Sequence, residues 1–283
     1  MTAHAKTIQI FLPDGNPRGV KIAEFTSRTI QAVLVPRAQL DFACKRPELN
    51  NVGLYFLFGE GESSSLPTLY IGEAEDCAKR LKQHNQLKDW WNYALVCISK
   101  TQEFTKAHVK YLEWYSHQLA KKAGRYKLEN GNVPVKSHIS EPVIADLMDH
   151  FQSIQTLSST LGYPLFDQIQ KGTGESNQLN CNGPQAKATG EYTDDGFIVF
   201  KGSTSRKNFT NAAHGFLKNI QQALIADGVL KEHEQDSLLF TRNYLFPSPS
   251  QASSIVLASN SNGWIKWKYS NGKTLDEVKR KSS

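Results

Sequence analysis

Alternating apolar and polar residues predict two short strands near the start of the chain. The strands cover residues 7–12 and 19–25, and a turn rich in Pro, Asp and Gly separates them, as in an antiparallel pair. A third strand is expected at residues 31–36 and a short helix at residues 37–49. A segment of this size is too small for us to expect independent folding, so residues 1–49 should form a β-rich cap that packs on the next domain of the chain.

Residues 50–135 have the pattern of a compact α/β domain. Two apolar runs joined by a loop rich in Gly, Glu and Ser predict a β-hairpin, and two helices and a further strand should come after it. A Thr before the second helix and a Gly after it supply the expected cap and stop. The expected elements are strands at 52–58 and 69–72, a helix capped by Glu75 or Asp76, a strand at 93–99, and a helix between Thr105 and Gly124.

The second half of the chain predicts a helical segment, a linker and a further domain. Residues 136–187 should contain the helical segment and a polar, Gly-rich linker, and residues 188–283 should form an α+β accessory domain. The fold class expected for the whole chain is therefore mixed α/β (α+β). The elements expected in this half are a helix at 143–161, linker sequence at 171–178 and 182–185, a strand at 196–201, helices at 209–225 and, capped by Ser248, at 249–258, and an aromatic strand over 263–275.

Length, hydropathy and cysteine content limit the class of protein. A chain of 283 residues suggests two or three domains. No apolar run approaches the roughly 20 residues of a membrane helix, and the N-terminus lacks a signal-peptide pattern, so we expect a cytoplasmic protein with no membrane partner. The cysteines have neither zinc-finger spacing nor the pattern of a disulfide framework, so they should be reduced thiols. They are Cys44, Cys77, Cys97 and Cys181.

The net charge of +6 and the sequence pI near 9.0 favour a polyanionic partner, although net charge bears on non-specific association and not on fold. The distribution is more informative, because basic residues crowd the stretch between Lys79 and Lys127. Within this stretch we expect Lys79, Lys82 and Lys110 to contact nucleic acid. The basic tail Lys279–Lys281 is expected to be a solvated chain end.

Two tyrosine-containing triplets and three later side chains are the candidates for a catalytic site. Gly53-Leu54-Tyr55 and Tyr70-Ile71-Gly72 lie in the two apolar runs. Arg80 and His84 are four residues apart on the next helix, so both should point to one face. A guanidinium suits a two-point grip on phosphate, and a histidine can position a water. Glu113, on the following helix, could hold Mg²⁺ together with substrate phosphate and several waters.

Each of these residues also has a purely structural interpretation. Tyrosines in strands most often pack in a core, and Arg80 could be a solvated helix residue. His84 could interact with carbonyl groups at the C-terminus of its helix, and Glu113 could be exposed. The order and context of all of them together favour a shared site over these separate explanations.

Together these features resemble the GIY-YIG nuclease family, with Leu54 in the place of the usual isoleucine. The resemblance covers roughly residues 50–135 and implies a small three-stranded antiparallel sheet flanked by helices. It also implies metal-dependent cleavage of phosphodiester bonds that leaves 5′-phosphate and 3′-hydroxyl ends, with Mg²⁺ or Mn²⁺ as the cofactor.

The resemblance also implies a role for each residue. Tyr55 would be the general base or would orient the attacking water, with Tyr70 as its partner. Arg80 would stabilise charge in the transition state, and Glu113 would be the sole protein ligand of the metal. His84 matches a histidine found in a branch that resembles certain restriction enzymes.

Two features of this assignment are open in the sequence. The late asparagine of the family pattern corresponds to Asn130 or Asn132, and we prefer Asn132, which comes just before Val133-Pro134. A phenol with an ordinary pKa near 10 is a poor base at neutral pH unless a nearby cation lowers that pKa. Arg80 and the metal are the cations expected to do so.

The last domain resembles the uncharacterised DUF4357 domain, which is similar to modules attached to restriction and methylation enzymes. The resemblance rests on residues 245–257, 262–267 and 272–275. A DNA-binding role for this domain is a hypothesis, and the alternative is that both of its tryptophans are core residues. The residues that would contact DNA are Lys201, Arg206, Lys207, Trp264, Lys266, Trp267 and Lys268.

We therefore expect a metal-dependent endonuclease acting on DNA, in defence, restriction or the processing of mobile elements. The alternatives are a catalytically silent nucleic-acid-binding module and an RNA-directed nuclease, because nothing in the sequence distinguishes ribose from deoxyribose. No organic cofactor is expected. Residues 271–274 lack the upstream glycine of a phosphate-binding loop, and Gly59 and Gly61 lie between strands instead of at a strand-to-helix turn.

Overall fold

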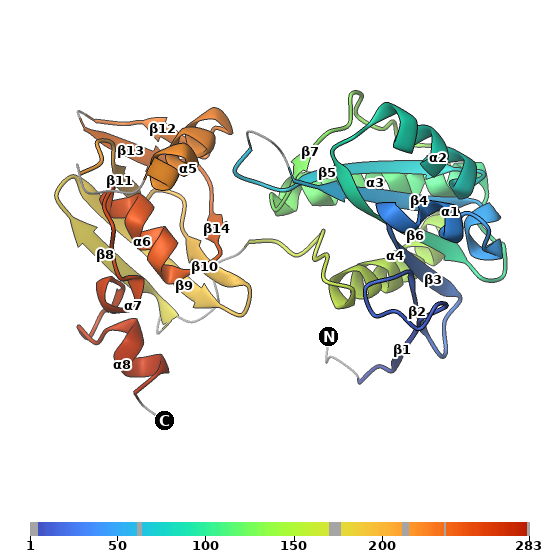
Figure 1. The fold of residues 1–283 in the computed structure, drawn as a ribbon, viewed down its shortest axis with the longest axis horizontal. Coiled ribbons are helices and arrows are strands. Elements are labelled where there is room, and N and C mark those ends of the chain that lie inside the picture. Colours follow the sequence, from blue (N-terminus) through green and yellow to red (C-terminus); the bar gives the residue numbers. More distant parts are fainter. Residues whose placement is uncertain (1–4, 61–63, 170–176, 211–214, 235, 282–283) are drawn as a thin grey trace. The chain divides into compact units, whose positions relative to one another are not determined.

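The chain divides into two compact units. The first consists of Met1–Glu62 with Leu66–Gln168, drawn mainly from blue to green, and the second of Ser63–Ser65 with Ile169–Ser283, drawn mainly from yellow to red (Figure 1). The computed structural model describes residues 5–60, 64–169, 177–210, 215–234 and 236–281.

The first unit combines a sheet with helices. Two short 3₁₀ turns, Arg37–Gln39 and Pro47–Asn50, flank its shortest helix. In chain order the other elements are β1 (Ile8–Phe11), β2 (Lys21–Phe25), β3 (Ile30–Pro36), α1 (Leu40–Ala43), β4 (Gly53–Gly59), β5 (Thr68–Ala74), α2 (Cys77–Leu87), β6 (Trp91–Ser99), α3 (Lys106–Ala123), β7 (Lys127–Leu128) and α4 (Glu141–Thr160).

Seven strands in the described part of this unit form one sheet, in the order β1-β2-β3-β6-β4-β5-β7, and only β5 and β7 run parallel. The resemblance stated from the sequence implied a small sheet of three strands over residues 50–135. Those strands, β6, β4 and β5, lie inside the larger sheet, because β3 pairs with β6 from Ile30 opposite Ser99 to Pro36 opposite Tyr93. The N-terminal strands are therefore part of this sheet and do not form a separate cap.

Helices cover both faces of this sheet (Figure 1). On one face α1 and α2 pack over side chains that include Tyr55, Leu57 and Val96. On the other face α3 and α4 pack over a second core that includes Leu54 and Phe56. Every residue of β4 is buried, which explains why its sequence is a continuous apolar run and not an alternating one.

Helices α2 and α3 have the predicted caps, whereas the first predicted helix is shorter than expected. Asp76 caps α2 by accepting a hydrogen bond from the Lys79 amide, and α3 begins at a Thr105 capping box and ends at Gly124, whose φ is +67°. The predicted helix over 37–49 is wrong in extent, since only Leu40–Ala43 is α-helical. Pro47 has no amide hydrogen to continue the helix, and a 3₁₀ turn begins there instead.

The second unit also mixes helices and strands. Its described part holds a five-stranded sheet, β14-β10-β9-β8-β15, and a three-stranded sheet, β11-β13-β12. The elements are β8 (Leu179–Gly183), β9 (Ala186–Thr193), β10 (Gly196–Val199), β11 (Thr204–Arg206), α5 (Gly215–Ala226), β12 (Leu230–Glu232), β13 (Ser237–Phe240), β14 (Tyr244–Phe246), α6 (Pro249–Leu257), α7 (Gly263–Lys266), β15 (Lys268–Tyr269) and α8 (Leu275–Lys279).

Two predictions for the second unit need correction. Residues 182–185, expected as linker, form the end of β8 and the two-residue turn that leads into β9, where Gln185 adopts a φ of +58°. The aromatic strand expected over 263–275 is a short helix followed by a two-residue strand, because Asn262 caps α7 and starts helical turns there. The helix capped by Ser248 is confirmed.

Two further expectations fall partly outside the described residues. Most of the predicted linker at 171–178 lies there, as does the stretch from 211 to 214 within the predicted helix at 209–225. In the described part of the chain, no helix is both long enough and apolar enough to cross a bilayer.

Gly72 permits the close approach of β5 to the side chain of Tyr55. The two residues face each other across the β4–β5 pair, and a Cβ atom added at Gly72 would collide with the Tyr55 phenol. Gly53 has a similar role next to Cys77, the first residue of α2, because an added Cβ would lie 2.9 Å from the Cys77 sulfur. Both motif glycines therefore make room for groups that pack on the α2 face.

We predict that Gly72→Ala lowers the free energy of unfolding by about 1–3 kcal/mol, as overpacking of a filled core does. The matched control is Gly131→Ala in the same unit, where an added Cβ meets no heavy atom within 4 Å. Urea unfolding at constant m-value measures both changes. Equal stability of the two variants would contradict the proposed contact between Gly72 and the phenol.

Candidate active site

Tyr55 lies at the centre of the candidate site. Its side chain projects from β4 towards α2 and is completely buried. Two groups on α2 contact its hydroxyl: the Arg80 Nε–H donates to it at 3.3 Å, and His84 Nε2 lies 2.8 Å from it. The four-residue spacing predicted that Arg80 and His84 share a face of their helix, and the structure brings both to one oxygen atom.

The direction of the hydrogen bond between Tyr55 and His84 follows from the charge state of the imidazole. Burial, together with the positive charges of Arg80 and Lys88, lowers the pKa of His84 to about 4. The ring is therefore neutral at pH 7, and Nε2 can accept the phenol proton. His84 Nδ1 then carries the ring proton, and it is buried with no hydrogen-bond partner among the described residues.

Tyr55 itself remains protonated. Burial and the neighbouring Tyr70 raise its pKa, although the hydrogen bond and the charge of Arg80 act in the opposite direction. Arg80 does act to lower the pKa of Tyr55, as expected from the sequence. The effect of burial is larger and of opposite sign, so the pKa of Tyr55 is raised overall. In this arrangement Tyr55 is a neutral hydrogen-bond donor and acceptor, and it has no surface exposed to solvent.

Tyr70 stands beside Tyr55 on β5 and is only partly buried. The two phenol rings stack with centroids 6.2 Å apart, and the His84 ring lies 5.0 Å from that of Tyr70. The Lys88 ammonium lies 4.9 Å from the centre of the Tyr70 ring, a cation–π geometry. Of the two tyrosines, Tyr70 is therefore the one that a substrate or a water can reach.

Glu113 is the acidic member of the site, and it comes from α3. Burial and the negative charge of Glu73 raise its pKa to about 7, while Lys106, Lys110 and Arg80 act to lower that pKa. Glu113 is therefore close enough to Arg80 to sense its charge. Sequence analysis missed Glu73, although it directly follows the second triplet; its carboxylate lies 2.8 Å from Lys106 Nζ.

The carboxylate of Glu113 fits a divalent cation. A half-buried carboxyl group beside a second negative charge is stabilised by a bound cation, because burial and the neighbouring carboxylate both disfavour its ionised form. No three His, Cys, Asp or Glu side chains of the described chain come together as a metal-binding group. A site with only one or two protein ligands is typical of Mg²⁺ or Mn²⁺, which keep several waters and bind oxygen atoms of the substrate. A structural zinc site would need four protein ligands.

The two candidate asparagines occupy different positions. Asn130 binds the backbone of the second triplet: its side chain donates to the Ile71 carbonyl at 2.7 Å and accepts from the Ile71 amide at 3.2 Å. Asn132, which the sequence favoured, is exposed. Asn130 thus continues the edge pairing of β7 along β5 and fixes the strand that carries Tyr70.

The predicted nucleic-acid contacts of the first unit do not all lie around Glu113. Lys79, Lys82 and Lys110 are exposed, but only Lys110 influences the pKa of Glu113. The charge of Lys82 instead acts to lower the pKa of the Cys44 thiol, so this lysine lies towards α1. Lys266 and Lys268, also exposed, belong to the second unit.

The tryptophans of the second unit differ from each other. Trp267 is fully buried and donates its indole N–H to the Pro249 carbonyl at 3.0 Å, so the core interpretation is correct for it. Trp264 is only partly buried. The tail residue Arg280 packs against Trp264, with its guanidinium carbon 3.4 Å from the ring centre, so this part of the tail is not simply a solvated end.

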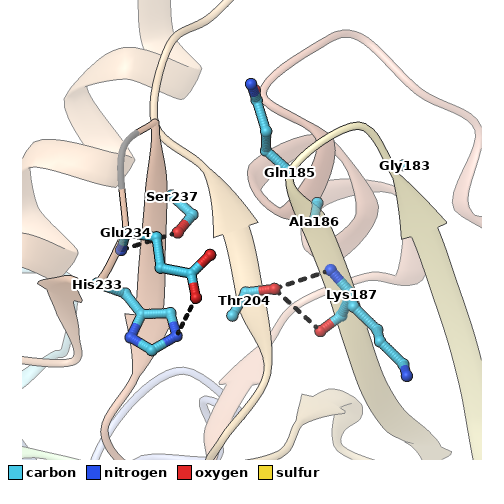
Figure 2. Close-up of a pocket in the computed structure, with 8 residues that line it drawn as sticks. All are labelled: Gly183, Gln185, Ala186, Lys187, Thr204, His233, Glu234 and Ser237. Carbon is cyan, nitrogen blue, oxygen red and sulfur yellow. Dashed lines mark hydrogen bonds and ion pairs between the residues drawn. The ribbon is translucent and has the colours of Figure 1, made fainter.

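A separate pocket of about 330 Å³ opens in the second unit (Figure 2). It lies beside the β8–β9 turn, β11 and the start of β13, and none of the predicted site residues lines it. The Thr204 hydroxyl accepts from the Lys187 amide at 2.9 Å, and His233 Nε2 is 3.9 Å from Glu234 Oε1. Most of the eight lining residues are polar or charged, among them Lys187, Thr204, His233, Glu234 and Ser237.

Comparison with known proteins concerns the second unit. A family model described as "Domain of unknown function (DUF4357)" matches residues 179–279. The match runs from the start of β8 to the end of α8 and agrees with the resemblance stated from the sequence. The search of curated proteins gave no match.

Proposed function

We propose that the first unit is a metal-dependent endonuclease of the GIY-YIG type that hydrolyses phosphodiester bonds in DNA. The observation that carries the proposal is the joining of Arg80 and His84 through the Tyr55 hydroxyl, with Glu113 within electrostatic range of Arg80. A fixed cation and a carboxylate that favours a bound cation are the two charges that an anionic phosphodiester requires. The products would carry 5′-phosphate and 3′-hydroxyl ends.

Arg80 would bind the scissile phosphate. Its Nε–H is held by Tyr55, and its Nη1 donates to Gln83 at 3.1 Å. These two bonds fix the plane of the guanidinium and leave further N–H groups for phosphate oxygens. Such a preorganised donor stabilises the charge that develops on the phosphorus-bound oxygens without reorganising during the reaction.

Tyr55 and His84 would move a proton without forming a phenolate. If Tyr55 Oη receives a proton from the attacking water, its own proton can pass to His84 Nε2, which is 2.8 Å away and unprotonated at neutral pH. The phenol ends the step neutral and the imidazole carries the charge. Because Tyr55 is buried, this route requires access past Tyr70.

Glu113 would hold the divalent cation. When bound, such an ion lowers the pKa of its water and stabilises negative charge on the phosphate. Glu73 pairs with Lys106 at 2.8 Å, yet its negative charge still raises the pKa of Glu113. Glu113 would therefore be the carboxylate that a bound cation stabilises.

A nucleic-acid-binding role without cleavage is the second candidate. The complete burial of Tyr55 favours it, because a group with no exposed surface cannot contact an attacking water in this conformation. The basic side chains around Glu113 would serve either role.

Purified protein should nick supercoiled plasmid DNA in the presence of Mg²⁺ or Mn²⁺, and Arg80→Ala and Glu113→Ala should each lower the rate by about 100-fold or more. Lys122→Ala and Glu129→Ala are the matched controls, because both residues are exposed on the same unit. A labelled RNA of the same sequence tests the sugar preference. Equal rates in all five proteins would refute the site, and binding without cleavage in all of them would support the second candidate.

The affinity for Mn²⁺ should depend on pH through Glu113. Its carboxyl group has a pKa of about 7 in the folded protein, so below pH 7 the metal must displace a proton and the affinity should fall by about tenfold per pH unit. Above pH 7 the affinity should be nearly constant. Isothermal titration of wild type and Glu113→Gln measures this; a flat pH profile, or unchanged affinity in the variant, would place the metal elsewhere.

A further inference from the structure

The second unit concentrates its positive charge in one short segment. Residues 263–281 carry six basic and two acidic side chains, whereas the remainder of the unit carries eight of each. The whole excess of positive charge in this unit therefore lies in the segment that forms α7, β15 and α8. Such a local excess attracts a polyanion even when the rest of the unit is balanced.

A buried tryptophan anchors this segment to the core of the unit. The ring of Trp267 packs 4.2 Å from that of Phe197, measured between centroids, and its N–H binds the Pro249 carbonyl. An added Cβ at Gly263 would collide with the same carbonyl, so the backbone approaches α6 closely there. The segment is thus held on a rigid base, while Lys266 and Lys268 on either side of Trp267 are exposed.

Trp264 supplies a partly buried aromatic ring two residues before Lys266 in the chain. The Arg280 guanidinium carbon lies 3.4 Å from the centre of its ring, and the edge of the Tyr192 ring packs at 5.3 Å between centroids. A distance of 3.4 Å is a stacking distance, so the planar guanidinium of the exposed Arg280 already covers one face of the Trp264 ring.

The two acidic side chains of the segment are engaged locally. Asp276 pairs with Lys281 at 3.1 Å and lies 3.8 Å from Arg280. Glu277 completes the capping box of α8 with Thr274. We call the partly buried Trp264 and the exposed Lys266, Lys268, Lys273 and Arg280 the basic–aromatic patch.

We propose that the basic–aromatic patch binds single-stranded nucleic acid. An unpaired base would stack on Trp264 in the place of the Arg280 guanidinium, which would turn to a neighbouring phosphate. Lys266 and Lys268 would contact the backbone. An aromatic ring that already accepts a planar cation, in a segment with an excess of basic residues, suits an alternation of flat bases and phosphates. An acidic peptide would use the charges but not the ring. The proposal is independent of the nuclease site.

Binding should be measured on the full chain carrying Glu113→Gln, in EDTA, by fluorescence anisotropy of a labelled oligothymidylate. Lys266→Gln/Lys268→Gln should weaken binding and lower the slope of log K against log[salt] by about 1.4, at about 0.7 for each phosphate contact with a single strand. The matched control is Lys218→Gln/Lys231→Gln, which removes the same charge from exposed positions of the same unit and should leave the slope unchanged.

Trp264→Ala should weaken oligothymidylate binding by about 5-fold to 150-fold, the range for one stacked base, and have less effect on a hairpin duplex. A circular-dichroism melt establishes that the variant is folded. Equal losses in the two double-lysine variants would overturn the proposal, as would tighter binding to the duplex than to the single strand, or preference for polyglutamate. Because metal and Glu113 are absent from the assay, these outcomes do not depend on whether the first unit cleaves DNA.

Discussion

The arrangement of the first unit depends on the packing of one phenol against one glycine. Tyr55 is buried between β5 and α2, and only a residue without a side chain at position 72 leaves room for it. Once the ring is fixed there, its hydroxyl determines where Arg80 and His84 point, because both bind the same oxygen. The two triplets thus form a single packing unit, in which the second glycine accommodates the first tyrosine.

Burial also determines which side chains of the site carry a charge. Desolvation keeps Tyr55 protonated and His84 neutral, so neither carries charge at pH 7. The charges that remain belong to Arg80 and the nearby lysines, opposite Glu113 and Glu73. A partner that combines a phosphate anion with a divalent cation would neutralise both sets, and this complementarity supports the proposed nuclease reaction.

Local patterns predicted most elements of the chain, but not how the strands combine. The caps at Thr105 and Ser248 depend on neighbouring residues only and were predicted correctly, and Asp76 is one of the two residues proposed for the cap of α2. The pairing of β3 with β6 joins residues about sixty positions apart, so nothing local could show that the N-terminal strands extend the central sheet. The contribution of Glu73 was missed for the same reason, since its neighbour Lys106 lies on another element.

The central claim is that Glu113 binds the metal and Arg80 binds the scissile phosphate. The most direct test is a crystal structure of the wild-type protein with Mn²⁺ and a non-hydrolysable phosphorothioate DNA, in which anomalous scattering locates the manganese. We expect a manganese peak within coordination distance of the Glu113 carboxylate and a phosphate oxygen, with the Arg80 guanidinium on the same phosphate. A manganese peak elsewhere in the chain, or bound DNA with no phosphate in contact with Arg80, would contradict the proposed site.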